Sequence, residues 1–363
     1  MQNGVFQTGN PRWSAVFSLF MGVMALIAAE FIPVSLLTPI ARDLAVSEGM
    51  AGQTVTAVGV LAVLTSLLLA PLTGNTDRRR ILLAFSAMLV ASYMLIGMAP
   101  TYSIMLIGRA ILGICVGGFW SLASAVTLQL VPTKDVPRAL SIVYAGVSVA
   151  TIIALPVASW IGHLIGWRNV FFLGALMAAF GFVWQYRALP SLPARAGSGF
   201  RDMSVLLRRT WILAGIGGNI LSFGGYHIFF TYLRPFLELD LALGANTLSV
   251  ILLVFGVANV LGTFIAGALL GNHFRSTMIL VHLAFTAAAL ALLLSQGHAD
   301  IGIALAVFWG FAFGFTPVGW STWIARTLSD KAELAGGLTV AATQFAIGLA
   351  AAVGGFTYDN LGI

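Results

Sequence analysis

Long apolar runs separated by short polar segments fill almost the whole chain. Within each run the hydrophobic residues are continuous rather than alternating, which is typical of membrane-spanning helices and not of membrane β-barrels. A helix needs roughly 20 apolar residues to cross a bilayer. Eleven runs qualify, at 14–38, 51–72, 81–98, 102–130, 139–161, 169–186, 211–236, 247–270, 276–294, 301–324 and 334–356. The pattern predicts an all-α polytopic membrane protein.

Composition supports this prediction. The 363 residues include 18 Lys+Arg and 12 Asp+Glu, so 8% are charged, and 59% are hydrophobic. Soluble domains average about 25% charged residues, and a soluble fold needs a more wettable surface than this chain offers. The single cysteine, Cys115, has no intrachain disulfide partner, so the fold does not depend on an oxidising compartment. The first run contains Glu30 and Pro33 and is too long for a cleaved signal peptide.

Basic residues are distributed unevenly between the predicted loops. With a cytoplasmic N-terminus, three face outward (Arg42, Arg168 and Arg234) and Arg109 falls within a span. The other fourteen face the cytoplasm: Arg12, Arg78, Arg79, Arg80, Lys134, Arg138, Arg187, Arg195, Arg201, Arg208, Arg209, Arg275, Arg326 and Lys331. This asymmetry follows the positive-inside rule. It predicts a multi-pass protein of a bacterial inner (plasma) membrane and explains the basic balance without nucleic acid.

The chain divides at a polar segment rich in Pro, Gly and Ser. We expect a six-helix bundle over 1–187, a cytoplasmic linker over 188–210 and a second bundle over 211–363. Shifting the sequence by 196 residues aligns Pro39 with Pro235, Arg79 with Arg275, and 139–166 with 335–362. Such parallel repeats are common in transporters. The repeat predicts a twelfth span, and the sequence favours a fragment that lacks this helix over a native odd number of spans.

Glu30 is the one acidic residue of the 12 that falls within a predicted span. A carboxylate there costs at least ~2–3 kcal/mol on insertion scales. Removal from water favours its protonated form, which suits reversible proton binding. Proton coupling by Glu30 is therefore one interpretation, and a hydrogen bond between helices is the other. Arg109 either helps to set the charge near Glu30 or extends outward to the interface. It precedes Gly113 and Gly117, a G-x-x-x-G pair suited to close helix contact.

Two further groups of residues are candidates for a conformational latch and for substrate binding. Asp77 and Arg78, between the second and third spans, predict a polar latch that breaks when the halves rock, although the arginines also serve as membrane anchors. The polar and aromatic residues expected to bind substrate are Trp120, Ser121, Tyr226, His227, Phe230, Trp320, Ser321 and Gln344. Rings of this kind stack on planar ligands, and amides and hydroxyls such as those of Asn219 read ligand edges. Ordinary belt or packing positions are the alternative.

Motifs for catalysis are missing from the sequence. The five histidines have no metal-ligand spacing, and there is no nucleotide-binding glycine loop or nucleophile elbow. We therefore expect a protein that is not an enzyme and has neither a cofactor nor a metal.

Several stretches resemble the major facilitator superfamily, and in particular its drug:proton antiporter branch. They are AEFIPVSLLTPIARDL at 29–44, the D-R-x-R motif from Asp77 to Arg80, GRAILG at 108–113, IALPVASWIG at 153–162 and WRNVFF at 167–172. Ala154 and Ala158 stand where that branch usually has glycine, which weakens a motif-based assignment of antiport. The resemblance implies two pseudo-symmetric bundles of six helices.

A closer resemblance, to bacterial nucleoside exporters, rests on PRWSAVFS, SEGMAGQTVT, FFTYLRP and PVGWSTWIARTLSDKAE. It implies proton-driven export of purine nucleosides such as inosine and guanosine, with a nucleoside, protons and the lipid bilayer as partners of a monomer. Export of sugars or amphipathic drugs by the same mechanism is an alternative, and so is a non-transporting membrane receptor or scaffold.

Overall fold

A computed structural model describes residues 11–74, 76–132, 135–193, 207–294, 298–327 and 332–361. The described chain is helical and contains no strand. Eleven of its helical segments are long and apolar enough to cross a membrane, which confirms the predicted all-α polytopic fold. Most of the predicted linker and the basic residues Lys134, Arg195, Arg201 and Lys331 lie outside the described residues.

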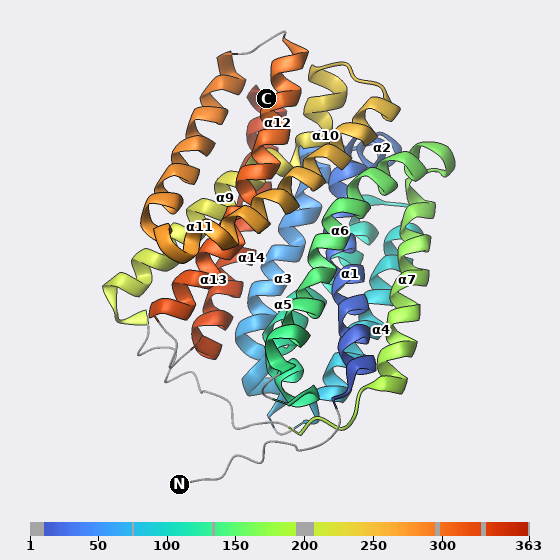
Figure 1. Ribbon diagram of the computed structural model, residues 1–363. Coiled ribbons are helices and arrows are strands. Elements are labelled where there is room, and N and C mark those ends of the chain that lie inside the picture. Colours follow the sequence, from blue (N-terminus) through green and yellow to red (C-terminus); the bar gives the residue numbers. More distant parts are fainter. Residues whose placement is uncertain are drawn as a thin grey trace.

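The helices run roughly side by side, with the first half of the chain next to the second (Figure 1). The first half contains α1 (Trp13–Ser35), α2 (Leu37–Asp43), α3 (Glu48–Thr73), α4 (Arg78–Gly97), α5 (Tyr102–Leu130), α6 (Val136–Ile165) and α7 (Trp167–Ala188). The second contains α9 (Thr210–Thr231), α10 (Leu233–Pro235), the π-helical turn η2 (Phe236–Asp240), α11 (Ala245–Leu294), α12 (Ala299–Phe313), α13 (Phe315–Thr327) and α14 (Ala332–Leu361).

Prolines set the ends of three helices more sharply than the hydropathy pattern predicts. Proline lacks the N–H that would bond to the carbonyl four residues earlier. In accordance with this, α1, α9 and α12 each end four residues before Pro39, Pro235 and Pro317, respectively. The predicted spans 14–38 and 211–236 are therefore too long at their C-terminal ends, and the span 301–324 is broken at Gly314.

The predicted spans 247–270 and 276–294 form one long element, α11. His273 departs from helical geometry, with φ of −125° and ψ of 43°, and the chain turns back there. The polar break between the two spans is thus a kink rather than a separate loop.

The internal repeat appears in the helix boundaries. Adding 196 to both bounds of α6 gives the bounds of α14, and the same shift takes the last residue of α1 to the last residue of α9. It also takes the start of α2 to the start of α10. The two halves therefore contain matching helices, while the exact bundle boundaries at 187 and 211 stay predictions.

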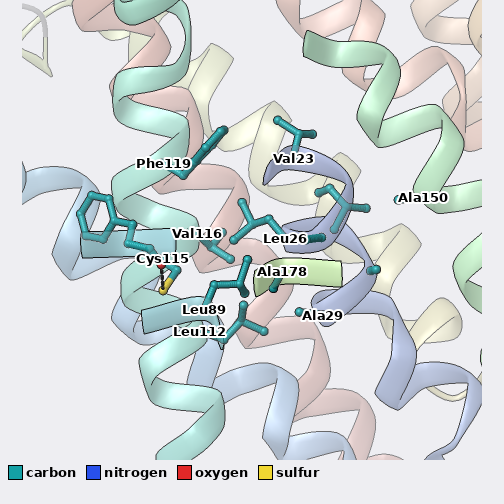
Figure 2. Packing of buried hydrophobic residues seen from close by; sticks show 14 of the residues in the cluster. Val23, Leu26, Ala29, Leu89, Leu112, Cys115, Val116, Phe119, Ala150 and Ala178 are labelled. Atoms are coloured by element: carbon teal, nitrogen blue, oxygen red, sulfur yellow. Dashed lines mark hydrogen bonds between the residues drawn. The ribbon is translucent and has the colours of Figure 1, made fainter. Parts of the chain in front are cut away.

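The core of the first half is largely apolar and closely packed. Figure 2 shows side chains of this core around Cys115, including Leu26, Leu89, Leu112 and Phe119. Cys115 is buried, and its Sγ lies 3.3 Å from the carbonyl oxygen of Phe85. The thiol therefore serves as a core residue in this half.

Close contact between α3 and α5 uses the predicted glycine pair. A Cβ added at Gly113 would lie 2.5 Å from the carbonyl oxygen of Val58, and one at Gly117 would meet the backbone of Ala62 even more closely. This confirms the proposed G-x-x-x-G contact.

The halves meet mainly where α3 packs along α14 and α6 along α11. At Gly59 on α3, an added Cβ would lie 2.6 Å from the carbonyl oxygen of Gln344 and 2.8 Å from the Cα of Gly348. Backbone therefore approaches backbone at the seam between the halves.

We expect Gly117→Ala to lower thermal stability in detergent by about 1–3 kcal/mol, because the added methyl group overpacks the α3–α5 contact. Gly217→Ala is the matched control, since Gly217 is also within a span and has open space around its missing Cβ. The control should be neutral or stabilising, because alanine favours helix. Equal effects of the two changes, measured by thermal unfolding, would contradict this reading of the contact.

Candidate functional site

Glu30 lies at the seam between the halves, in the C-terminal part of the membrane-spanning helix α1. Its side chain is half-buried, and its Oε1 accepts a hydrogen bond of 3.3 Å from Nε2 of Gln344 on α14. Gln344 is buried. The structure thus brings together two residues predicted for different roles, one for proton coupling and one for substrate binding. Protonation of Glu30 changes the charge at a contact that joins the two halves.

Arg109 is fully buried, with 0% of its surface exposed. Pro33 leaves the carbonyl of Ala29 without a helical donor, and Nη1 of Arg109 donates to that oxygen at 2.7 Å. Its Nε donates to the carbonyl of Thr54 at 3.1 Å, whereas Nη2 has no hydrogen-bond partner among the described residues. Arg109 therefore joins α5 to α1 and α3 rather than extending outward to the interface.

No ion pair within 4.0 Å joins Glu30 and Arg109 in the described chain. Arg109 instead bonds to the backbone of Ala29, the residue before Glu30. The guanidinium is therefore fixed close to the backbone that carries the carboxylate, with one donor nitrogen left unused.

Aromatic rings form a continuous stack in the second half. Tyr226 stacks on Phe313 with ring centroids 3.4 Å apart and on Phe230 at 5.0 Å. Phe230 meets the ring of Phe31, the neighbour of Glu30, edge to face at 5.3 Å. His227 is buried against the same rings. The sequence predicted Tyr226, His227 and Phe230 but missed Phe313. Phe313 lies on another helix and meets three aromatic rings of α9, and only contact information identifies such a residue.

Two buried donors lie on the same side of this half. Asn219 accepts a 3.0 Å hydrogen bond from Thr343, the neighbour of Gln344, through its Oδ1. Its Nδ2 and the indole Nε1 of Trp320 have no partner among the described residues. The Trp320 ring lies close to Gly218, the residue before Asn219. Unpaired buried donors are uncommon and call for an explanation, such as a ligand acceptor.

The remaining predicted substrate residues lie apart from this group. Trp120 on α5 stacks on Tyr144 at 5.5 Å, and the Ser121 hydroxyl donates to the carbonyl of Gly117 in its own helix. Ser321 is exposed on α13. The structure thus places Trp320 beside Gly218 of α9 and joins α9 to α14 through Asn219 and Thr343, but it places Trp120 and Ser121 in the other half.

Hydrogen bonds tie the two halves at the end of the bundle where α3 begins, which we name the Ser47 end. The carboxylate of Asp359 on α14 accepts from the Ser47 hydroxyl at 2.6 Å and from the Gly49 N–H at 3.0 Å. Tyr232 donates to the carbonyl of Gly49 across the seam at 3.4 Å. Within the second half it donates to the carbonyl of Ala351 at 2.9 Å and stacks on Tyr358, with ring centroids 5.4 Å apart. The Asp359 carboxylate also lies at the N-terminus of α3, where the helix dipole favours a negative charge.

Arg234 strengthens the same end. It is 6% exposed, and its Nε donates to Glu238 at 2.8 Å while Nη1 donates to Ser159 of α6 at 3.2 Å. Nη1 also donates to the carbonyl of Ser35, which Pro39 leaves without a helical donor. The charge pattern of the sequence predicted Arg234 in an outer loop, but the structure buries it between the halves. The missed signal is that Pro39 frees a backbone carbonyl within the membrane, and such a carbonyl needs a donor such as Arg234.

Asp77 and Arg78 lie at the opposite end, which we name the Asp77 end. The Asp77 carboxylate caps α4 by accepting from the Arg79 N–H at 2.8 Å, and it also accepts from the Ser191 hydroxyl at 2.6 Å and the Leu192 N–H at 2.9 Å. Nη1 of Arg78 donates to Thr73 at 2.8 Å. These bonds join the α3–α4 turn to the segment after α7, so they connect parts of the first half.

The environment of Asp77 shifts its acidity. Partial burial alone would raise the pKa of Asp77, but the hydrogen bonds from Ser191, Leu192 and Arg79 outweigh it, and the pKa is lowered from its ordinary value. The folded state therefore favours the charged carboxylate, and this contribution to stability is present above the ordinary pKa of about 3.9 and lost as pH falls below it.

The sequence model of the Major Facilitator Superfamily matches residues 19–355. The chain belongs to the major facilitator superfamily. This superfamily is one of membrane transport proteins and not a class of enzymes, so the chain is a multi-pass bacterial membrane transporter by family.

Relatives within the superfamily include the purine ribonucleoside efflux pump NepI of Salmonella paratyphi C (strain RKS4594) and that of Salmonella typhi. Each is 41% identical over 353 residues, which cover 97% of this chain and 89% of the relative. Among solved structures, the nucleoside transporter NupG has a TM-score of 0.78 at 15% identity, covering 98% of this chain and 94% of its own. A bacterial homologue of the lysosomal transporter Spinster has a TM-score of 0.77 at 14% identity, covering 96% and 82%. These two structures show the superfamily fold.

We expect Asp77→Ala to lower stability by about 1 kcal/mol at neutral pH, because the helix cap is lost. The difference should shrink as pH falls through the lowered pKa of Asp77, since the native carboxyl is then neutral. Thermal unfolding in detergent at several pH values measures this, and Asp77→Asn, which keeps an acceptor without charge, is the control. A difference that stays constant down to acid pH would contradict the charged cap.

We expect Asp359→Ala to open the Ser47 end, because Ser47 and Gly49 lose their partner across the seam. A Cys115→Ser background with Ala51→Cys reports this, since Ala51 is 1% exposed and packs in the cluster beneath Tyr232. A membrane-impermeant maleimide should label the reporter several-fold faster in Asp359→Ala. Asp300→Ala, which removes an exposed carboxylate from the first turn of α12, should leave the labelling rate unchanged. Equal rates in both variants would show that Asp359 does not hold this end closed.

Proposed function

We propose that this protein is a proton-coupled antiporter that exports purine ribonucleosides, such as inosine and guanosine, across the bacterial inner membrane by alternating access. The observation that carries the proposal is the position of Glu30, a membrane carboxylate bonded across the seam to Gln344. The purine ribonucleoside efflux pumps at 41% identity support the substrate class. The protein acts as a monomer with its N-terminus in the cytoplasm.

The state of the seam supports alternating access. The Ser47 end, which faces outward in this proposal, is held by side chains of the second half: Asp359 bonds to Ser47, Tyr232 to the carbonyl of Gly49, and Arg234 to the carbonyl of Ser35. The Asp77 end faces the cytoplasm, and its polar contacts join parts of the first half. The structure then corresponds to a state closed to the outside, from which a cytoplasmic substrate is loaded.

The proton acts through Glu30. A ligand shifts a conformational equilibrium only when it binds the two states with different affinity. Protonated Glu30 is neutral and retains its hydrogen bond to Gln344, whereas the carboxylate is attracted to Arg109, which has an unused donor at Nη2. The proton therefore alters the balance between a contact across the seam and an attraction within the first half.

The nucleoside binds between the aromatic stack and the unpaired donors. The planar base stacks on an aromatic ring of the Tyr226, Phe230 and Phe313 group. Inosine and guanosine both carry an acceptor oxygen on the six-membered ring, which suits the free Nδ2 of Asn219 or Nε1 of Trp320. A bare sugar gains less from aromatic stacking, so a nucleoside fits this set better.

We expect Glu30→Gln to abolish efflux of labelled inosine driven by a pH gradient, because glutamine has a similar shape and hydrogen-bonding reach but cannot bind a proton reversibly. The assay uses proteoliposomes that contain the full chain. Wild-type rates of gradient-driven efflux in Glu30→Gln would refute the role of Glu30.

Exchange of labelled for unlabelled inosine without a pH gradient is the control, since it requires substrate binding and alternation but no net proton movement. Glu30→Gln should retain this exchange. Loss of exchange as well would place Glu30 in substrate binding or folding, and a wild-type protein that exchanges no nucleoside would refute the proposed substrate.

A further inference from the structure

His282 occupies the packed face of the second span of α11. Met278, Val281 and Phe285 are its neighbours on this face, and each is at least partly buried in a hydrophobic cluster. The Nδ1 of His282 lies 2.7 Å from the carbonyl oxygen of Met278. A carbonyl oxygen only accepts hydrogen bonds, so Nδ1 carries a hydrogen. This fixes one of the two ring nitrogens of His282 as a donor.

The other ring nitrogen faces a serine. Nε2 of His282 lies 2.5 Å from the hydroxyl oxygen of Ser222 on α9, and the same oxygen lies 2.7 Å from the carbonyl of Gly218. Ser222 has a single hydroxyl hydrogen. If that hydrogen goes to Gly218, Nε2 must donate to Ser222, and the ring is a charged imidazolium. If it turns to Nε2, the ring is neutral and the side-chain bond to Gly218 is given up.

Both protonation states of His282 are therefore hydrogen-bonded, and rotation of one hydroxyl group connects them. We propose that His282 and Ser222 form a second proton-binding site, in the half of the chain that does not contain Glu30. When a proton binds to Nε2, the Ser222 hydroxyl rotates so that it donates its hydrogen bond to the Gly218 carbonyl instead of to Nε2. This site goes beyond the proposed role of Glu30 and does not depend on it.

None of the described side chains around His282 gives its ring a fixed counter-charge. On α9, the titratable neighbours of Ser222 are Tyr226 and His227, and Tyr226 reaches His282 only through the ring of Phe285. On α11, Arg275 is two turns away and exposed, and on α12 Asp300 is exposed at the first turn. The described side chains of α13 include no ionisable group. The net charge of this site therefore depends on whether the His282 ring carries its second proton.

The position of the site suggests what the proton does. Helix α9 packs mainly along α14, so the bond from Ser222 to His282 is a polar tie between α9 and α11. The same helix carries Asn219 and Tyr226 of the candidate substrate site. A charged ring makes a stronger hydrogen bond than a neutral one, so proton binding tightens the hold on α9.

The test is nitrogen NMR of the purified full chain with ¹⁵N-labelled histidine rings. We expect one ring to change from doubly protonated to neutral as pH rises. Its neutral form should keep the hydrogen on Nδ1. The His282 signal is the one that His282→Gln removes or, if that variant does not fold, the one that Ser222→Thr shifts.

Variants separate the site from a packed neutral histidine. Ser222→Ala should lower the ratio of doubly protonated to neutral ring about tenfold at a given pH, because the charged ring loses the stronger hydrogen bond, while Ser222→Thr restores the ratio. Ser276→Ala, an exposed serine on α11 bonded to a backbone carbonyl, is the control without effect. The titration should persist in Glu30→Gln. A ring that stays neutral throughout, carries its hydrogen on Nε2 when neutral, or ignores Ser222→Ala would overturn the proposal.

Discussion

The architecture depends on how two carbonyl groups of the first helix find hydrogen-bond donors, one left free by Pro33 within α1 and one by Pro39 in α2. Pro33 and Pro39 each remove a backbone donor, and in a membrane an unpaired carbonyl has no water to bond with. Arg109 fills one vacancy from within the first half, and Arg234 fills the other from the second half. These two bonds fix the middle and the end of α1, and Glu30 lies between them. The candidate coupling residue is thus held by its backbone while its side chain faces the seam.

This arrangement divides the seam into parts with different properties. Near the middle of α3, Gly59 lets this helix approach the backbone of α14, and Thr56 donates to the carbonyl of Gly348 across this contact at 2.9 Å. At the Ser47 end, the hydrogen bonds between the halves are those of Asp359 with Ser47 and Gly49 and that of Tyr232 with the carbonyl of Gly49. A rocking motion of the halves would therefore have to break the directional hydrogen bonds at the Ser47 end, as the proposed alternating access requires.

Much of the fold could be predicted from the sequence, because a bilayer makes span length and hydropathy nearly sufficient to locate helices. The 196-residue repeat also reappears in the bounds of α6 and α14. The errors at three helix ends have one cause. Hydropathy does not register the missing N–H of a proline, so helix ends near Pro39, Pro235 and Pro317 were placed too late or missed.

The candidate site was harder to predict. By itself, the sequence determined that Glu30 and Arg109 are the polar residues that lipid makes most expensive, because that expense depends only on depth in a span. Only the tertiary structure decided that Glu30 contacts Gln344, that Arg109 bonds to backbone carbonyls, and that Ser222 faces His282. Those pairings join residues far apart in the chain, and hydrogen bonds form over about 3 Å. Periodicity shows which face a residue occupies, but only helix packing decides which partner lies within that distance.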